Sequence, residues 1–189
     1  MNIFKKKTNI SAFIIVIFFI AFLIVLWTVR GDLLFVGYNK YFIAPSCNKT
    51  DKFLKTHLNE LSYVAGKLSE MDYESITIRN KSIGGEDGYS MNVRSDNLAY
   101  ESIPVPDNLI NHIETLYENG IQDISFGCNS VNFTMWSTMD ESRGIIYSYA
   151  GTKPDGEQLI EVSQLSEDNW YYYVHNYEKA KDRNPERFK

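Results

Sequence analysis

The sequence contains few of the residues that most often carry chemistry. Its 189 residues include only two cysteines and three histidines. His57, His112 and His175 lie far apart, and none belongs to an HExxH segment or has a second histidine three to five residues away, so no metal site is expected. No GxSxG segment marks a nucleophilic serine, although the members of a Ser/His/Asp triad need not be sequence neighbours. We therefore expect no enzyme and no cofactor.

A phosphate-binding loop is also missing. Gly84, Gly85 and Gly88 match neither the P-loop nor the dinucleotide-binding pattern, and no Lys-Ser/Thr pair follows them. They stand between two segments of alternating apolar and polar residues, which is typical of the turn of a β-hairpin. The glycines therefore predict a turn and no nucleotide site.

Acidic residues are absent from the first 29 residues, and residues 10–29 carry no charge at all. Twenty residues of helix span about 30 Å, the thickness of the hydrocarbon core of a membrane. Lys5, Lys6 and Lys7 precede this segment and only Arg30 follows it, so the N-terminus should stay in the cytoplasm. A cleaved signal peptide is the alternative, but the apolar run is too long and no small-x-small site ends it. We expect a basic flank at residues 1–9, a single transmembrane anchor at residues 10–29 and a connector at residues 30–46.

Positive charge is scarce in the rest of the chain. Residues 31–178 contain 10 Lys or Arg against 22 Asp or Glu, a net charge of −12. Such a domain repels nucleic acid and anionic lipid and attracts basic proteins. The alternative is that the charge only keeps the domain soluble. Residues 179–189 form a basic tail, expected to be solvated or to fold back on the acidic surface.

The two cysteines, Cys47 and Cys128, both lie on the expected outer side of the membrane, where disulfides persist. A bond between them would close a loop of about 80 residues and stabilise the fold by about 4 kcal/mol on the chain-entropy model. The alternative is two unpaired thiols. We expect the disulfide.

Residues 47–178 predict an α+β domain outside the cytoplasm, with two helices packed on a mainly antiparallel sheet of six or seven strands. There is no internal sequence repeat. Leu54, Leu58, Leu61, Ala65 and Leu68 form one stripe of an amphipathic first helix. The expected elements are this helix, capped by Thr50; a hairpin of residues 76–79 and 89–94; a helix from Asp107 to a stop at Gly120; and strands near residues 124–128, 131–135, 145–149, 159–165 and 170–177.

The last of these strands is unusually rich in tyrosine. With period two, Tyr171, Tyr173, His175 and Tyr177 share one face. Tyrosine is enriched at protein interfaces, which makes this row a candidate partner surface. The alternative is that both faces of the strand are covered within the domain.

These observations favour a single-pass cell-membrane protein that presents an acidic protein-binding module outside the cytoplasm. Such a layout suits an immunity or inhibitor protein, or an accessory protein of envelope assembly. A small envelope hydrolase with an unrecognised site, or a purely structural anchor, are the alternatives. The sequence indicates neither a specific partner nor an oligomeric state.

Overall fold

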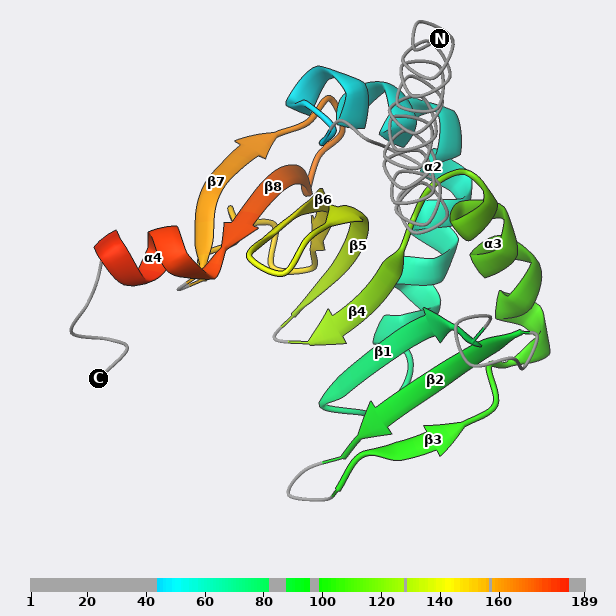
Figure 1. The fold of residues 1–189 in the computed structure, drawn as a ribbon. Coiled ribbons are helices and arrows are strands. Elements are labelled where there is room, and N and C mark those ends of the chain that lie inside the picture. Colours follow the sequence, from blue (N-terminus) through cyan, green and yellow to red (C-terminus); the bar gives the residue numbers. More distant parts are fainter. Residues whose placement is uncertain (1–43, 82–87, 96–98, 128, 157, 184–189) are drawn as a thin grey trace, which may run out of the picture. The chain divides into compact units, whose positions relative to one another are not determined.

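The computed structural model of the chain describes residues 44–81, 88–95, 99–127, 129–156 and 158–183 (Figure 1). The helices and strands in these residues belong to one compact unit, residues 43–189. The elements in chain order are α2 (Cys47–Ser69), β1 (Ser75–Asn80), β2 (Tyr89–Arg94), β3 (Glu101–Ile103), α3 (Asp107–Glu118), β4 (Asp123–Gly127), β5 (Ser130–Ser137), β6 (Glu141–Ser148), β7 (Leu159–Gln164), β8 (Trp170–Asn176) and α4 (Tyr177–Arg183).

No helix among these described residues is long and apolar enough to cross a membrane. The expected transmembrane anchor at residues 10–29, with its basic flank and most of the connector, lies outside the described residues. The anchor therefore stays a prediction.

All eight strands form one antiparallel sheet in the order β3-β2-β1-β4-β5-β6-β8-β7. Its inner part consists of two similar halves, since α2-β1-β2-β3 and α3-β4-β5-β6 are each a helix followed by a three-stranded meander. The halves meet where β1 pairs with β4, and the β7–β8 hairpin extends the sheet beyond β6. The α+β class and the antiparallel sheet are confirmed, although the halves share no recognisable sequence repeat.

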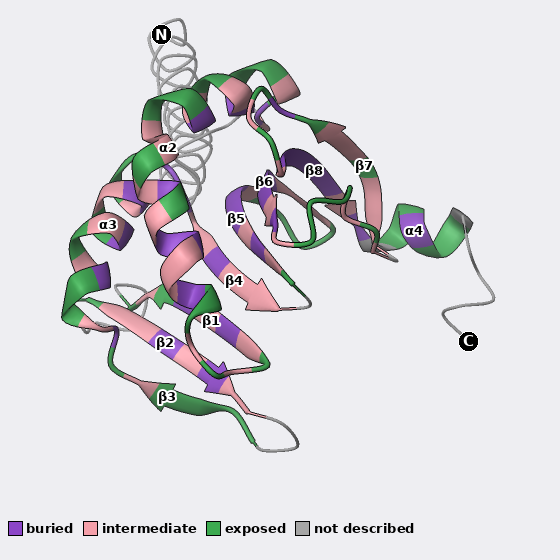
Figure 2. Cartoon of the chain, turned by 180° about the vertical axis from the view of Figure 1, so that it is seen from behind, coloured by how far each residue is buried: buried purple, intermediate pink, exposed green. Residues whose placement is uncertain are grey.

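Helices α2 and α3 lie against each other and pack on one face of the sheet (Figures 1 and 2). The expected stripe on α2 is confirmed: Leu54, Leu61, Ala65 and Leu68 are almost fully buried, and Leu58 is half-buried. Alternate residues of the strands point towards the helices and form one core with this stripe, among them Ile76, Ile124 and Phe133. Burial of these apolar side chains is the main term that holds the helices to the sheet.

Helix α2 begins three residues before its expected start. Ser46 occupies the N-cap position without a side-chain hydrogen bond, and the Thr50 amide donates to the Ser46 carbonyl at 3.0 Å. Thr50 is therefore not the cap; it is fully buried in the first turn, and its Oγ1 has no hydrogen-bond partner among the described residues. For α3, Pro106 occupies the N-cap position and the expected cap, Asp107, lies in the first turn. Gly120 follows the end of α3 with a φ of +114°, as expected.

Three other details differ from expectation. The sheet has eight strands, because the three-residue strand β3 adds to the seven that alternation predicts. Strand β6 begins at Glu141, four residues before the strand expected near residues 145–149. The last strand ends at Asn176, and Tyr177 begins a third described helix, α4, which includes part of the expected basic tail.

Candidate functional site

The expected row of exposed tyrosines is not present on β8. Tyr171 and Tyr173 are only 5% and 4% exposed, and the Tyr173 hydroxyl lies 2.9 Å from Thr134 Oγ1. Burial raises the pKa of Tyr173 to about 12, so its hydroxyl is neutral. The structure favours the alternative in which both faces of the strand are covered. Tyr177 lies on α4 instead of β8, and its side chain is outside the described residues.

Tyr172, on the helix-covered face of β8, holds the start of the domain. Its hydroxyl donates to the Pro45 carbonyl at 3.2 Å and accepts from Arg143 Nη1 at 3.4 Å. The same Arg143 pairs with Glu141, whose carboxylate also accepts from Asn176 Nδ2. This chain of contacts connects the segment preceding α2 to β6 and β8.

His175 lines a concave surface, as does Tyr173 of the same predicted row. It faces away from the helices, in a groove of about 670 Å³ between β4, β5, β6, β8 and the connection from β6 to β7. We call this the open-face groove. Its charged lining residues are Lys153 and Asp155, and its uncharged polar ones are Ser125, Asn129, Ser130, Asn132, Thr134, Ser142, Ser148, Thr152, Tyr173 and His175.

The sheet is distorted beside this groove by an irregular pairing of β5 with β6. The register shifts between Thr134 and Trp136, so β5 contains a bulge there. Gly144 lies opposite Thr134, and a Cβ added to it would lie 2.0 Å from the Phe133 carbonyl oxygen. A bulge bends its strand and re-aims the neighbouring side chains, and a glycine permits this close backbone approach. Both features lie directly beside the polar residues of the groove.

Several polar side chains in the groove have unused hydrogen-bonding capacity. Within the described part of the chain, the side chains of Ser125, Asn132, Ser148 and His175 make no hydrogen bond to the protein. Burial lowers the pKa of His175, which keeps its imidazole neutral at pH 7. The groove therefore offers uncharged donors and acceptors to a bound molecule.

The geometry does not assemble a catalytic group around His175. Ser142 is its neighbour across the strand pair, but no hydrogen bond joins His175 to Ser142 or to a carboxylate among the described residues. A general base needs its nucleophile within about 3 Å and a third group that orients it. The described residues also hold no group of three or more His, Cys, Asp or Glu side chains that could bind a metal. This arrangement is suited to binding a ligand.

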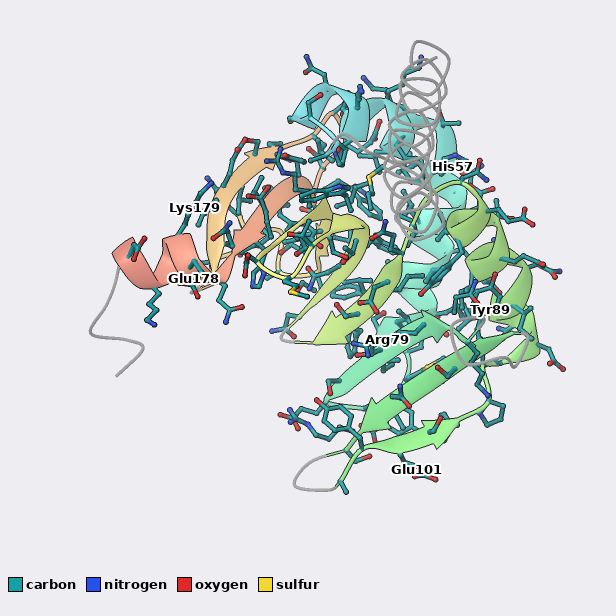
Figure 3. The ribbon with its side chains drawn as sticks, viewed as in Figure 1. His57, Arg79, Tyr89, Glu101, Glu178 and Lys179 are labelled. Atoms are coloured by element: carbon teal, nitrogen blue, oxygen red, sulfur yellow. The ribbon has the colours of Figure 1, made fainter. Side chains whose placement is uncertain are left out.

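A smaller hollow of about 360 Å³ continues from the groove towards β1, and Thr134 and Ser142 line both. Arg79 Nε lies 3.1 Å from Asp123 Oδ1 in this hollow (Arg79 is labelled in Figure 3). Burial raises the pKa of Asp123, and the nearby guanidinium of Arg79 opposes that shift. The hollow thus contains one matched pair of charges.

The other two histidines, His57 and His112, each contact an aromatic ring. His57 lies at a kink in α2, with φ −120° and ψ 25°, and its ring lies 4.5 Å from the ring of Phe53 (Figure 3). His112 of α3 stacks on Tyr63 of α2 at 4.2 Å. His112 therefore contributes to the packing of α3 on α2, whereas His57 contacts a ring of its own helix.

The predicted disulfide involves a residue outside the described part of the chain, Cys128. Cys47 is described, as a half-buried free thiol at the start of α2. Burial raises the pKa of this thiol, and the nearby carboxylates of Glu161 and Asp51 raise it further. A thiol with a raised pKa is a poor nucleophile at pH 7. The disulfide stays a prediction.

Six basic side chains of the domain form internal ion pairs. Lys55, Lys67, Arg79, Arg94, Arg143 and Lys179 each lie within 4 Å of a carboxylate of the domain. Helix α3, by contrast, contains Asp107, Glu114 and Glu118 and no lysine or arginine. We call the outer side of this helix the acidic face of α3. Tyr89 beside it has a raised pKa, because of burial first and then of the charges of Glu114 and Glu118.

Sequence reasoning singled out His175 and Tyr173 but did not find the groove. The other lining residues are serines, threonines and asparagines on separate strands, which in a sequence are indistinguishable from an ordinary solvated sheet face. No protein-family model, curated protein or solved structure matches the chain.

Proposed function

We propose that the chain is a single-pass membrane protein whose acidic α+β domain lies outside the cytoplasm and binds a basic protein partner. The observation that carries the proposal is the acidic face of α3, in a domain where six basic side chains already pair internally. An excess of charge of one sign attracts partners of the opposite sign and raises their association rate.

The layout suits an immunity or inhibitor protein that acts at the membrane, or an accessory protein of envelope assembly. Support for a binding role over an envelope enzyme comes from His175, since no hydrogen bond joins it to a serine hydroxyl or to a carboxylate among the described residues. Support for the anchor comes from the uncharged residues 10–29 and the lysines before them.

The test is a crosslinking pull-down of the full-length chain from intact membranes, at low and at high salt. We expect one specific basic protein to be recovered, with a yield that falls at high salt because exposed charges are screened within about 10 Å at 0.1 M. Glu114→Lys should reduce the yield, because it reverses a charge on the acidic face of α3. Asn111→Ser is the matched control, since Asn111 is exposed on the same helix and uncharged.

Recovery of no specific protein would count against the proposal. So would a partner whose yield is the same for Glu114→Lys, Asn111→Ser and the unmodified chain. In either case the acidic charge would serve solubility alone.

A further inference from the structure

We propose that the open-face groove binds a neutral, hydroxyl-rich ligand of the size of a short oligosaccharide. This is a second binding activity beyond the proposed protein partner. The groove lies on the face of the sheet opposite to α3, so each activity can fail without the other.

The size and shape of the groove suit a small ligand. Its volume of about 670 Å³ lies within the range of about 300 to 1,000 Å³ that is usual for ligand sites. The bulge in β5 and the close approach at Gly144 distort the sheet beside it, and the connection from β6 to β7 forms one wall. A flat solvated sheet would offer no such concave surface.

The hydrogen-bonding groups of the groove match hydroxyl groups. Ser125 and Asn132 are paired across β4 and β5, and Ser148 lies on the next strand. None of these side chains makes a hydrogen bond within the described protein. Serine hydroxyls and asparagine amides each donate and accept, as sugar hydroxyls do, so both partners can be satisfied.

The charge of the groove argues against an ionic ligand. His175 and Tyr173 are neutral at pH 7, and Lys153 and Asp155 on the connection from β6 to β7 have opposite charges. This balance contrasts with the net charge of −12 between residues 31 and 178. The charges that line the groove balance, so the lining itself favours neither a cation nor an anion, and a neutral polar ligand needs no charged partner there.

Apolar side chains are interspersed among the polar ones. Ile146 is opposite Asn132, and Leu159 is opposite His175. A sugar ring carries C–H groups on its faces and hydroxyls around its edge. The apolar residues can cover the C–H groups while their polar neighbours bind the hydroxyls, and burial of both surfaces contributes to affinity.

The test is calorimetric titration of the full-length chain in lipid nanodiscs, which avoids sugar-containing detergents. The probes are neutral tetramers of glucose, mannose, galactose and N-acetylglucosamine, with tetragalacturonate and the glucosamine tetramer as charged probes. We expect at least one neutral tetramer to bind with a Kd below about 1 mM, and the charged probes to bind at least about tenfold more weakly.

Substitutions in the open-face groove test whether the ligand binds there. Asn132→Ala and Ser125→Ala should each weaken binding about tenfold through loss of hydrogen bonds. Asn92→Ala is the matched control, because Asn92 lies on the same sheet face, on β2, outside the groove. Unchanged thermal unfolding of the variants separates lost binding from lost folding.

Three results would overturn the proposal. They are the absence of binding by every neutral tetramer at about 10 mM, equal binding of charged and neutral tetramers, and equal weakening by Asn92→Ala and Asn132→Ala.

Discussion

At the scale of single residues, the carboxylate of Glu141 contacts three side chains from three different elements, β6, β8 and α4. Arg143 Nε and Nη2 each lie 2.6 Å from its Oε1, Asn176 Nδ2 lies 3.2 Å from its Oε2, and Lys179 Nζ lies 3.9 Å from the same oxygen. Burial acts to raise its pKa, but the hydrogen bonds from Arg143 and Asn176 hold the pKa below its ordinary value. The charged form therefore stabilises the joint between β6, β8 and α4.

Replacing this carboxylate with an amide should loosen that joint. We expect Glu141→Gln to lower the free energy of unfolding by about 1 to 3 kcal/mol, because hydrogen bonds to a charged group are lost. Urea unfolding followed by tryptophan fluorescence measures the change. Glu114→Gln, on an exposed position of α3, is the control and should stay within about 0.5 kcal/mol of the unmodified chain. Equal stability of the two variants would contradict the role of Glu141.

The carboxylate of Asp51 should make the stability of the fold depend on pH. Its carboxylate accepts from Lys55 Nζ at 2.7 Å and from the Ser166 amide at 2.8 Å, which together lower its pKa to about 2. Because the folded pKa lies below the unfolded value of about 3.9, the stabilisation is present above that value and is lost as the pH falls towards 2.

The substitution Asp51→Asn tests whether this stabilisation is lost as the pH falls. We expect it to lower the free energy of unfolding by about 1 kcal/mol at pH 7, and the difference from the unmodified chain to vanish near pH 2. Urea unfolding at pH 7, 4 and 2.5 measures it. Asp72→Asn, at an exposed position, should show no such convergence. A deficit of constant size from pH 7 to pH 2.5 would contradict the electrostatic explanation.

At the scale of elements, two glycines on different elements should respond in opposite directions to alanine. In β6, the added Cβ of Gly144 would lie 2.0 Å from the Phe133 carbonyl oxygen, so strands β5 and β6 must separate. In α2, Gly66 has no atom within 4 Å of an added Cβ. We expect Gly144→Ala to destabilise the fold by about 3 kcal/mol or more, and Gly66→Ala to stabilise it by about 0.5 to 1 kcal/mol. Thermal unfolding of both variants measures this, and a loss of stability in Gly66→Ala would contradict it.

The elements that the sequence predicted correctly are those with a long periodic pattern. The stripe from Leu54 to Leu68 and the alternation around Ile76 have enough repeats to define one buried face each. Strand β3 has three residues and no buried one, so no pattern could indicate it. Among the residues of α4 whose side chains the structure describes, Ala180 alone is buried, and the Lys179 amide donates to Asn176 Oδ1. Both features depend on neighbours that the local sequence does not contain.

At the scale of the whole molecule, the open-face groove shows why a site can escape sequence reasoning. Asn132 lies beside Ser125 and Ile146 only because of the register of β4, β5 and β6. In the sequence these residues lie on three different strands, and each one fits an ordinary solvated position. The burial of Tyr171 and Tyr173 could not be predicted for a related reason. Alternation places both side chains on one face of the strand but does not say what covers that face.

The orientation of the whole chain in the membrane gives a last prediction. A reporter fused after Lys189 should be active only outside the cytoplasm, because the three lysines before residues 10–29 are retained on the cytoplasmic side. Replacing Lys5, Lys6 and Lys7 together with asparagine should allow a fraction of the chains to insert with the opposite orientation. The matched control replaces Lys49, Lys52 and Lys55, three lysines beyond the apolar segment. Their removal takes positive charge from the outer side, so it should leave the orientation unchanged. Reporter activity in the cytoplasm for the unmodified chain would contradict both the orientation and the proposed binding of a partner outside the cell membrane.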